Sequence, residues 1–201
     1  SNGSRPDALT GDFAFVTWRR SDESIVAIRD AFGIKILYYE KSSSLLAFSS
    51  HPSLLFDGGD LDERYIADVL CASRIEEGRS VYANVSVVPP GCLVRCNNEV
   101  LSLQRYWSPM DVIESQSTST REPVAEFTEL FDRSLAACYG GVGRTWADLS
   151  GGLDSSSIVM MSHRRHERGE RTARLAGTLT VVDESADGDE RRFSDLVVHD
   201  T

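Results

Sequence analysis

Short apolar segments of strand length dominate the first hundred residues. They occupy residues 11–18, 25–29, 36–39, 45–48, 85–88, 92–96 and 100–103, with polar turns between them. The first two flank a polar turn at 21–23 and predict a hairpin, and 85–88 and 92–96 are predicted as strands around the turn at 89–91. Runs that are apolar at both alternating sets of positions are typical of sheets buried on both faces. The pattern therefore predicts layered β-sheets with helices outside, one of which Asp60 caps.

The pattern changes after residue 110. A stretch rich in serine and threonine at 111–121 interrupts the hydrophobic positions, and we place a domain boundary there. Apolar residues then recur at helical spacing and predict a core-facing helix, with Val124, Phe127, Leu130, Phe131, Leu135 and Cys138 on its face. A strand up to residue 149, a helix, a second strand at 175–182 and a second helix at 189–198 follow. This order predicts a parallel sheet.

The first of these two helices ends in the charge run 163–168, HRRHER. Cations at the end of a helix are favourable because the negative end of the helix dipole lies there. We therefore interpret the run as a solvated helix end in preference to a phosphate contact.

Composition narrows the class of protein. The chain has 201 residues and a formal net charge of −10, so it has no excess of cations with which to displace counterions from nucleic acid or anionic lipid. It contains no apolar run long enough to span a membrane, and its first residues do not resemble a signal peptide. We expect a soluble, cytoplasmic protein, with neither nucleic acid nor membrane as a partner.

The four cysteines, Cys71, Cys92, Cys96 and Cys138, are too scattered for a disulfide framework. Cys92 and Cys96 share one face of a predicted strand, but no histidine or second cysteine pair completes a zinc site. We expect reduced and mostly buried thiols.

The residues with candidate chemistry follow the first strand of the second half. The segment WADLSGGLDSSSI (146–158) predicts a strand, a glycine loop and the beginning of a helix. A strand that runs into a helix through two glycines leaves several backbone N–H groups unpaired at the positive end of the helix dipole. Gly151 and Gly152 let the backbone approach an anion closely, and Ser150, Ser155 and Ser156 add hydroxyl donors. The loop is therefore suited to phosphate oxygens, although a plain glycine turn with a capping side chain is the alternative.

The loop contains a carboxylate, Asp154, and no lysine. A carboxylate beside a phosphate requires a bridging cation, for which Mg²⁺ is the natural choice because it binds one or two carboxylates together with phosphate oxygens. The loop is not a Walker loop, since the Gly-Lys-Ser/Thr ending is absent.

The seven residues SGGLDSS (150–156) resemble the pyrophosphate loop of the N-type ATP pyrophosphatases. Upstream, GDFAFVTW (11–18), AIRDAFGI (27–34), LYY (37–39), VPPG (88–91) and RYW (105–107) resemble, in the same order, the glutaminase domain of asparagine synthetases. The chain is thus similar to the asparagine synthetase family over almost its whole length. In that family ATP adenylates a carboxylate with release of pyrophosphate, and an amine then displaces AMP to give an amide.

The resemblance implies a fold class and domains. Residues 1–110 would form an incomplete, Ntn-hydrolase-like α+β domain of layered β-sheets with flanking helices. Residues 111–121 would be a linker, and 122–201 the start of an α/β, parallel-sheet nucleotide-binding domain.

The resemblance also implies site residues. ATP and Mg²⁺ would be bound by Leu149, Ser150, Gly151, Gly152, Asp154, Ser155 and Ser156. Asp154 would be both the catalytic residue and the metal ligand, and Leu149 would contact adenine. Asp189 and Glu190 either line the substrate cleft or form an ordinary acidic helix start.

The N-terminal cysteine and the Asn-Gly-Glu segment that release ammonia from glutamine in this family have no counterpart here. The chain is either a fragment of a glutamine-dependent enzyme or a relative whose glutaminase half has lost its chemistry, such as a β-lactam synthetase or lasso-peptide cyclase. The similarity favours the cyclase branch, which forms a macrolactam and implies a precursor peptide as partner.

Two further alternatives stay open. One is another enzyme of the pyrophosphatase fold, a sulfurtransferase or NAD synthetase, against which the β-rich half argues. The other is a non-catalytic module that binds a peptide or a partner subunit. The sequence specifies neither the carboxylate and amine substrates nor the oligomeric state.

Overall fold

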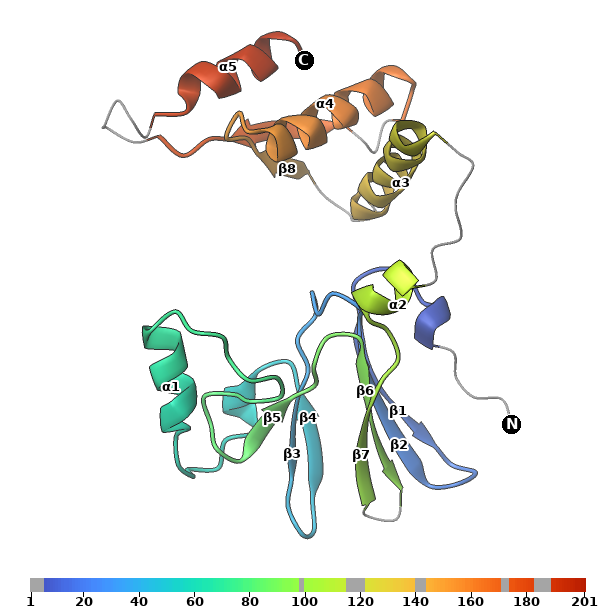
Figure 1. Ribbon diagram of the computed structural model, residues 1–201, viewed down its shortest axis with the longest axis vertical. Helices are drawn as coiled ribbons and strands as arrows, with labels where there is room; N and C mark the ends of the chain where they lie inside the picture. Colours follow the sequence, from blue (N-terminus) through green and yellow to red (C-terminus); the bar gives the residue numbers. More distant parts are fainter. Residues whose placement is uncertain (1–5, 98–99, 115–121, 140–143, 171–173, 183–188) are drawn as a thin grey trace. The chain divides into compact units, whose positions relative to one another are not determined.

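The fold was analysed in a computed structural model, which describes residues 6–97, 100–114, 122–139, 144–170, 174–182 and 189–201. The chain divides into two compact units, Ser1–Ser117 and Thr118–Thr201, and each is described separately. The first contains small antiparallel sheets, and the second contains a parallel strand pair with helices (Figure 1).

The central sheet of the first unit has the strand order β1-β2-β6-β7 and is antiparallel throughout. Its strands are β1 (Ala14–Arg19), β2 (Ser24–Arg29), β6 (Cys92–Asn97) and β7 (Val100–Arg105). The predicted hairpin is confirmed, since β1 pairs with β2. Along β2 the buried side chains alternate between two clusters: Ala27 belongs to one, and Val26 and Ile28 to the other. Strand β2, in which residues 25–28 are all apolar, is therefore buried on both faces of the sheet, as expected.

A smaller antiparallel sheet has the order β4-β3-β5, formed by β3 (Tyr38–Lys41), β4 (Leu46–Ser49) and β5 (Val85–Val87). Tyr39 and Phe48 from this sheet pack against a buried cluster that includes Ala27 and Val94 of the central sheet. The prediction that 85–88 and 92–96 form strands is confirmed, but they do not pair around the turn at 89–91. β5 pairs with β3, whereas β6 pairs with β2 and β7, because the turn carries the chain from one sheet to the other.

The helices of the first unit differ in detail from the sequence prediction. Asp62, and not Asp60, caps α1 (Glu63–Leu70), because its carboxylate accepts a hydrogen bond from the Tyr65 backbone N–H at 2.9 Å and also binds Arg79. Short 3-10 turns occur at Pro6–Ala8 (η1) and Pro52–Leu54 (η2). Helix α2 (Pro109–Glu114) contains residues 111–114 of the predicted linker, and residues 115–121 lie outside the described residues.

The two sheets are joined by polar groups at the end of β2. The Arg29 guanidinium donates hydrogen bonds to the backbone oxygens of Lys35 and Val88, both at 2.8 Å. The Asp30 carboxylate, 1% exposed, accepts hydrogen bonds from the N–H groups of Ile34 at 3.0 Å and Lys35 at 2.9 Å. Burial raises the pKa of the Asp30 carboxyl, but these N–H donors outweigh burial and hold the pKa below its ordinary value.

The second unit consists of a parallel pair, β8 (Thr145–Asp148) and β9 (Leu175–Leu179), with the helices α3 (Pro123–Cys138), α4 (Leu153–Glu167) and α5 (Arg191–His199). Strands β8 and β9 pair in parallel, with helix α4 between them in the chain, so the predicted parallel pairing is confirmed.

Helix α3 was predicted to face the core along its whole length, and this is wrong for its first half and for Cys138 at its end, which is exposed. Leu135 near its end is 8% exposed, whereas Phe127 is 67% exposed. The interpretation of 163–168 as a solvated helix end is likewise wrong at one position. The Arg165 side chain is 10% exposed and pairs with Asp132 of α3 at 2.6 Å and with Glu170.

No helix in the described part of the chain is both long and apolar enough to cross a membrane. The described cysteines are free: Cys92 is buried and Cys96 partly so, but Cys71 and Cys138 are exposed. The prediction of reduced thiols holds for them, and the prediction of burial holds for two.

The Asp30 anchor predicts a pH-dependent loss of stability in an Asp30→Asn variant. A carboxyl with a lowered pKa stabilises the fold above its unfolded pKa of about 4, and this contribution disappears as the pH falls through the folded pKa. The variant should be about 1–3 kcal/mol less stable than wild type at pH 7, because an amide replaces a doubly hydrogen-bonded carboxylate. The difference should shrink below about pH 4.

Urea midpoints at pH 7 and at about pH 3 measure this difference. The exposed Asp12→Asn is the control, since it makes the same chemical change at a surface position. A difference of the same size at both pH values would contradict the assignment.

Candidate functional site

The base of the glycine loop is fixed at the end of β8 by Leu149. Its side chain is 1% exposed. Its N–H donates to the Leu179 oxygen at 2.7 Å, and its own oxygen accepts from the Thr180 hydroxyl at 2.7 Å. The side chain is in the core and both backbone groups are bonded, and the expected contact of Leu149 with adenine stays a prediction. Leu149 holds the loop in place.

Two of the predicted phosphate-binding hydroxyls build the loop itself. The Ser150 hydroxyl oxygen accepts a hydrogen bond from the Gly152 N–H at 3.3 Å. The Ser155 hydroxyl oxygen accepts from the Ser150 N–H at 3.2 Å and lies 3.1 Å from the Ser150 hydroxyl. The backbone turns at Gly151, where φ is +79°, and α4 begins after Gly152. The structure therefore brings together, at one helix start, all of the residues that the sequence predicted for this loop.

The free hydrogen-bond donors lie in the first turn of α4. The first bond of the helix runs from the Ser156 N–H to the Gly152 oxygen at 3.0 Å, so the N–H groups of Leu153, Asp154 and Ser155 precede the helical ladder. Within the described part of the chain, the Ser156 hydroxyl oxygen is buried and has no hydrogen-bond partner. Gly152 is exposed and Gly151 is partly exposed, so an anion can reach the backbone here.

Asp154 occupies the second position of α4 and is exposed. The described residues contain no group of three or more His, Cys, Asp or Glu side chains that could hold a metal ion by themselves. The donor set therefore does not suit an all-protein cage. It suits Mg²⁺ held by one carboxylate together with phosphate oxygens and water.

Helix α5 packs directly against the loop, which the sequence pattern did not indicate. A Cβ built on Gly151 would lie 2.3 Å from the Phe193 Cβ and 2.8 Å from the Ser194 nitrogen. The positive φ of Gly151 and this close approach together account for the glycine. Asp189 accepts hydrogen bonds from the Arg191 guanidinium, with Nε 2.8 Å from each carboxylate oxygen, and this contact lowers the Asp189 pKa. Asp189 also accepts from the Arg191 N–H at 3.1 Å, whereas Glu190 precedes α5 without a side-chain capping bond, and a place for either residue in a substrate cleft stays a prediction.

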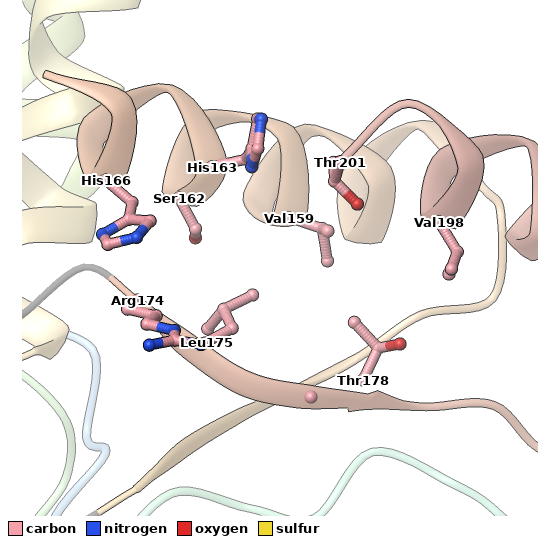
Figure 2. Close-up of a pocket in the computed structure, with 10 residues that line it drawn as sticks. Val159, Ser162, His163, His166, Arg174, Leu175, Thr178, Val198 and Thr201 are labelled. Atoms are coloured by element: carbon pink, nitrogen blue, oxygen red, sulfur yellow. The ribbon is translucent and has the colours of Figure 1, made fainter.

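A separate hollow of about 590 Å³ lies between α4, β9 and the end of α5 (Figure 2). Ser162 and His166 point from α4 towards it, and Thr178 points into it from β9. The Ser162 hydroxyl donates to the Ile158 oxygen and also bonds with the Tyr139 hydroxyl. No residue of the glycine loop lines this hollow.

Comparisons with known families agree with this division of the chain. The sequence model for the glutamine amidotransferase domain matches residues 4–107, which is more than half of the chain, and the model for asparagine synthase matches residues 126–201. The chain belongs to the asparagine synthetase family. It combines the glutamine amidotransferase domain with part of the asparagine synthase domain, which includes the glycine loop.

Similar proteins include asparagine synthetase [glutamine-hydrolyzing] 3 of Bacillus subtilis, 26% identical over 168 residues that cover 81% of this chain and 27% of that protein. Asparagine synthetase [glutamine-hydrolyzing] 2 of the same organism is 24% identical over 193 residues, covering 88% and 26%. The amidase chry2 of Gibberella zeae is 29% identical over 209 residues, covering 94% and 30%. The chain thus spans about a quarter to a third of the length of these relatives.

The contact of the loop with α5 predicts a large effect of Gly151→Ala. The left-handed backbone costs about 1–2 kcal/mol for a residue with a Cβ, and overpacking against Phe193 costs a further 1–3 kcal/mol. We expect the free energy of opening of the β8–β9 pair to fall by about 2–4 kcal/mol, measured by amide hydrogen exchange.

Gly169→Ala is the matched control. Gly169 also has a positive φ, +94°, but a Cβ there meets nothing within 4 Å. Gly169→Ala should lower the free energy of opening by only the cost of the left-handed backbone, about 1 kcal/mol. Equal losses for the two variants would show that packing of α5 on the loop contributes nothing.

Proposed function

We propose that the complete protein is an ATP-dependent ligase that adenylates a carboxylate and transfers the acyl group to an amine. The observation that carries the proposal is the helix start at residues 150–156, where unpaired N–H groups, a buried hydroxyl without a partner and one exposed carboxylate lie within the first turn of α4. Its position in the segment matched by the asparagine synthase model supports the same reaction class.

In the proposed reaction a carboxylate oxygen attacks the α-phosphorus of ATP, and the bond to the bridging oxygen of pyrophosphate breaks. An amine then attacks the acyl carbon and AMP leaves, so that an amide is formed. Negative charge increases on pyrophosphate in the first step. Backbone N–H donors that the helix start already fixes in place stabilise that charge with little reorganisation, which favours the transition state over the ground state.

The loop residues divide into two roles. Gly151 and the first N–H groups of α4 bind pyrophosphate oxygens, together with the hydroxyl of Ser156. The Gly152 N–H, which donates to the Ser150 hydroxyl in the structure, joins them when that hydroxyl turns away. Ser150 and Ser155 hold the loop in shape through their mutual contact, and their hydroxyls turn to phosphate when it is present. Asp154 carries Mg²⁺, which when bound offsets the charge of the phosphates.

The amine has two candidate sources. The similarity that favours the cyclase branch leads us to propose an amine of a peptide substrate, which would close a macrolactam as in lasso-peptide cyclases. Ammonia from glutamine is equally supported, because residues 4–107 match the glutamine amidotransferase domain and the Bacillus subtilis relatives are named as glutamine-hydrolysing.

Isothermal calorimetry with ATP and Mg²⁺ tests the proposal. Asp154→Asn should weaken binding by roughly tenfold or more, because the neutral amide does not attract Mg²⁺ and binding of the bare phosphates beside the loop is poorer. Asp195→Asn, an exposed change of the same chemistry on α5, should leave the affinity within about twofold.

Without Mg²⁺ the affinity of wild type for ATP should also fall, and wild type and Asp154→Asn should then bind ATP about equally well. A wild-type chain that takes up no nucleotide would contradict the ligase proposal and favour a module that only binds a peptide or a partner subunit.

A further inference from the structure

The glycine loop lacks a cation of its own. Residues 149–157 contain no lysine or arginine, yet the proposed leaving group carries several negative charges beside Asp154. A cationic side chain that reaches the loop from another helix or strand would therefore stabilise the negative charge of the leaving group. One candidate lies at the start of α5, because this helix packs on Gly151.

A single aromatic residue connects this cation to the loop. The guanidinium carbon of Arg192 lies 4.4 Å from the centroid of the Phe193 ring. The Cβ of Phe193 in turn fills the position that a side chain at Gly151 would occupy. Phe193 thus contacts the loop and supports the cation, and stacking on the ring restricts the otherwise flexible arginine.

The two neighbouring arginines at this helix start have different partners. Arg191 is held by Asp189, whose carboxylate accepts hydrogen bonds from its Nε and Nη2. Its charge is largely offset there. Within the described part of the chain, Arg192 pairs with no carboxylate, and its guanidinium lies over the Phe193 ring. Arg192 is also exposed, so its fork of N–H donors is available to an anion.

We propose that Arg192 is a further phosphate-binding residue, which contacts the pyrophosphate group held by the glycine loop. The inference rests on the proposed function. A guanidinium can bind two phosphate oxygens at once, and it keeps its charge at every physiological pH. The phosphate site then comprises two helix starts: α4 supplies backbone N–H groups and Asp154, and α5 supplies Arg192 on the Phe193 platform.

Binding of inorganic pyrophosphate with Mg²⁺ to the 201-residue chain, measured by calorimetry at low salt, tests this role. Arg192→Gln should raise the dissociation constant about 5- to 10-fold, and Arg192→Lys about 2- to 3-fold, since lysine keeps the charge and loses the fork. Phe193→Leu should weaken binding about 2- to 5-fold, because the arginine loses its platform while the loop keeps an apolar neighbour.

Arg168→Gln is the matched control for net charge, since Arg168 lies at the opposite end of α4. It should change the dissociation constant by less than about twofold. The loss in Arg192→Gln should also shrink as salt is raised to about 0.5 M, and a purely structural defect would not show that dependence.

The outcomes separate the two levels of inference. If wild type binds pyrophosphate and Asp154→Asn weakens it, but Arg192→Gln equals Arg168→Gln, the role of Arg192 is wrong and the ligase proposal stands. If wild type binds no pyrophosphate, the proposed function is wrong and the role of Arg192 falls with it. Circular dichroism of Arg192→Gln, an exposed position, verifies that the variant is folded.

Discussion

The second unit depends on the close contact between the glycine loop and α5. Gly151 adopts a left-handed backbone and leaves no room for a side chain beneath Phe193. Because the loop turns there, α4 begins at Leu153, and its first N–H groups are unpaired at an exposed helix start. The same turn brings the start of α5 to the loop. One steric constraint therefore fixes both the free donors of α4 and the position of the neighbouring arginine.

In the first unit, hydrogen bonds from two charged side chains to the backbone fix the path of the chain. Arg29 ends the buried strand β2 and Asp30 follows it, and their side chains satisfy backbone groups of residues 33–35 and of Val88. A buried ion of either sign is costly unless it is hydrogen-bonded, so these bonds specify how the chain passes from one sheet to the other. The unit is therefore a β-rich scaffold whose sheets are joined by polar anchors as well as by the core between them.

Local patterns predicted the elements well, and long-range contacts were the source of the errors. The hairpin β1–β2 and the order β8, α4, β9 follow from periodicity and turn residues, which act over a few positions. The pairing of β5 with β3 joins segments more than forty residues apart, and the local turn at 89–91 suggested a hairpin instead. Likewise, neither the buried ion pair of Arg165 with Asp132 nor the contact of Phe193 with Gly151 has a signal in spacing. The strand–loop–helix geometry at 146–158 was predictable because the residues that set it are consecutive.

The central claim is that the beginning of α4 binds pyrophosphate through backbone amides that the glycine turn leaves free. Amide chemical shifts in a titration with Mg²⁺ and pyrophosphate test it most directly. The account predicts that the largest shifts occur at Gly151, Gly152, Leu153 and Asp154, with smaller ones at the start of α5. Shifts confined to the hollow around His166 and Thr178, or no shifts at all, would contradict it.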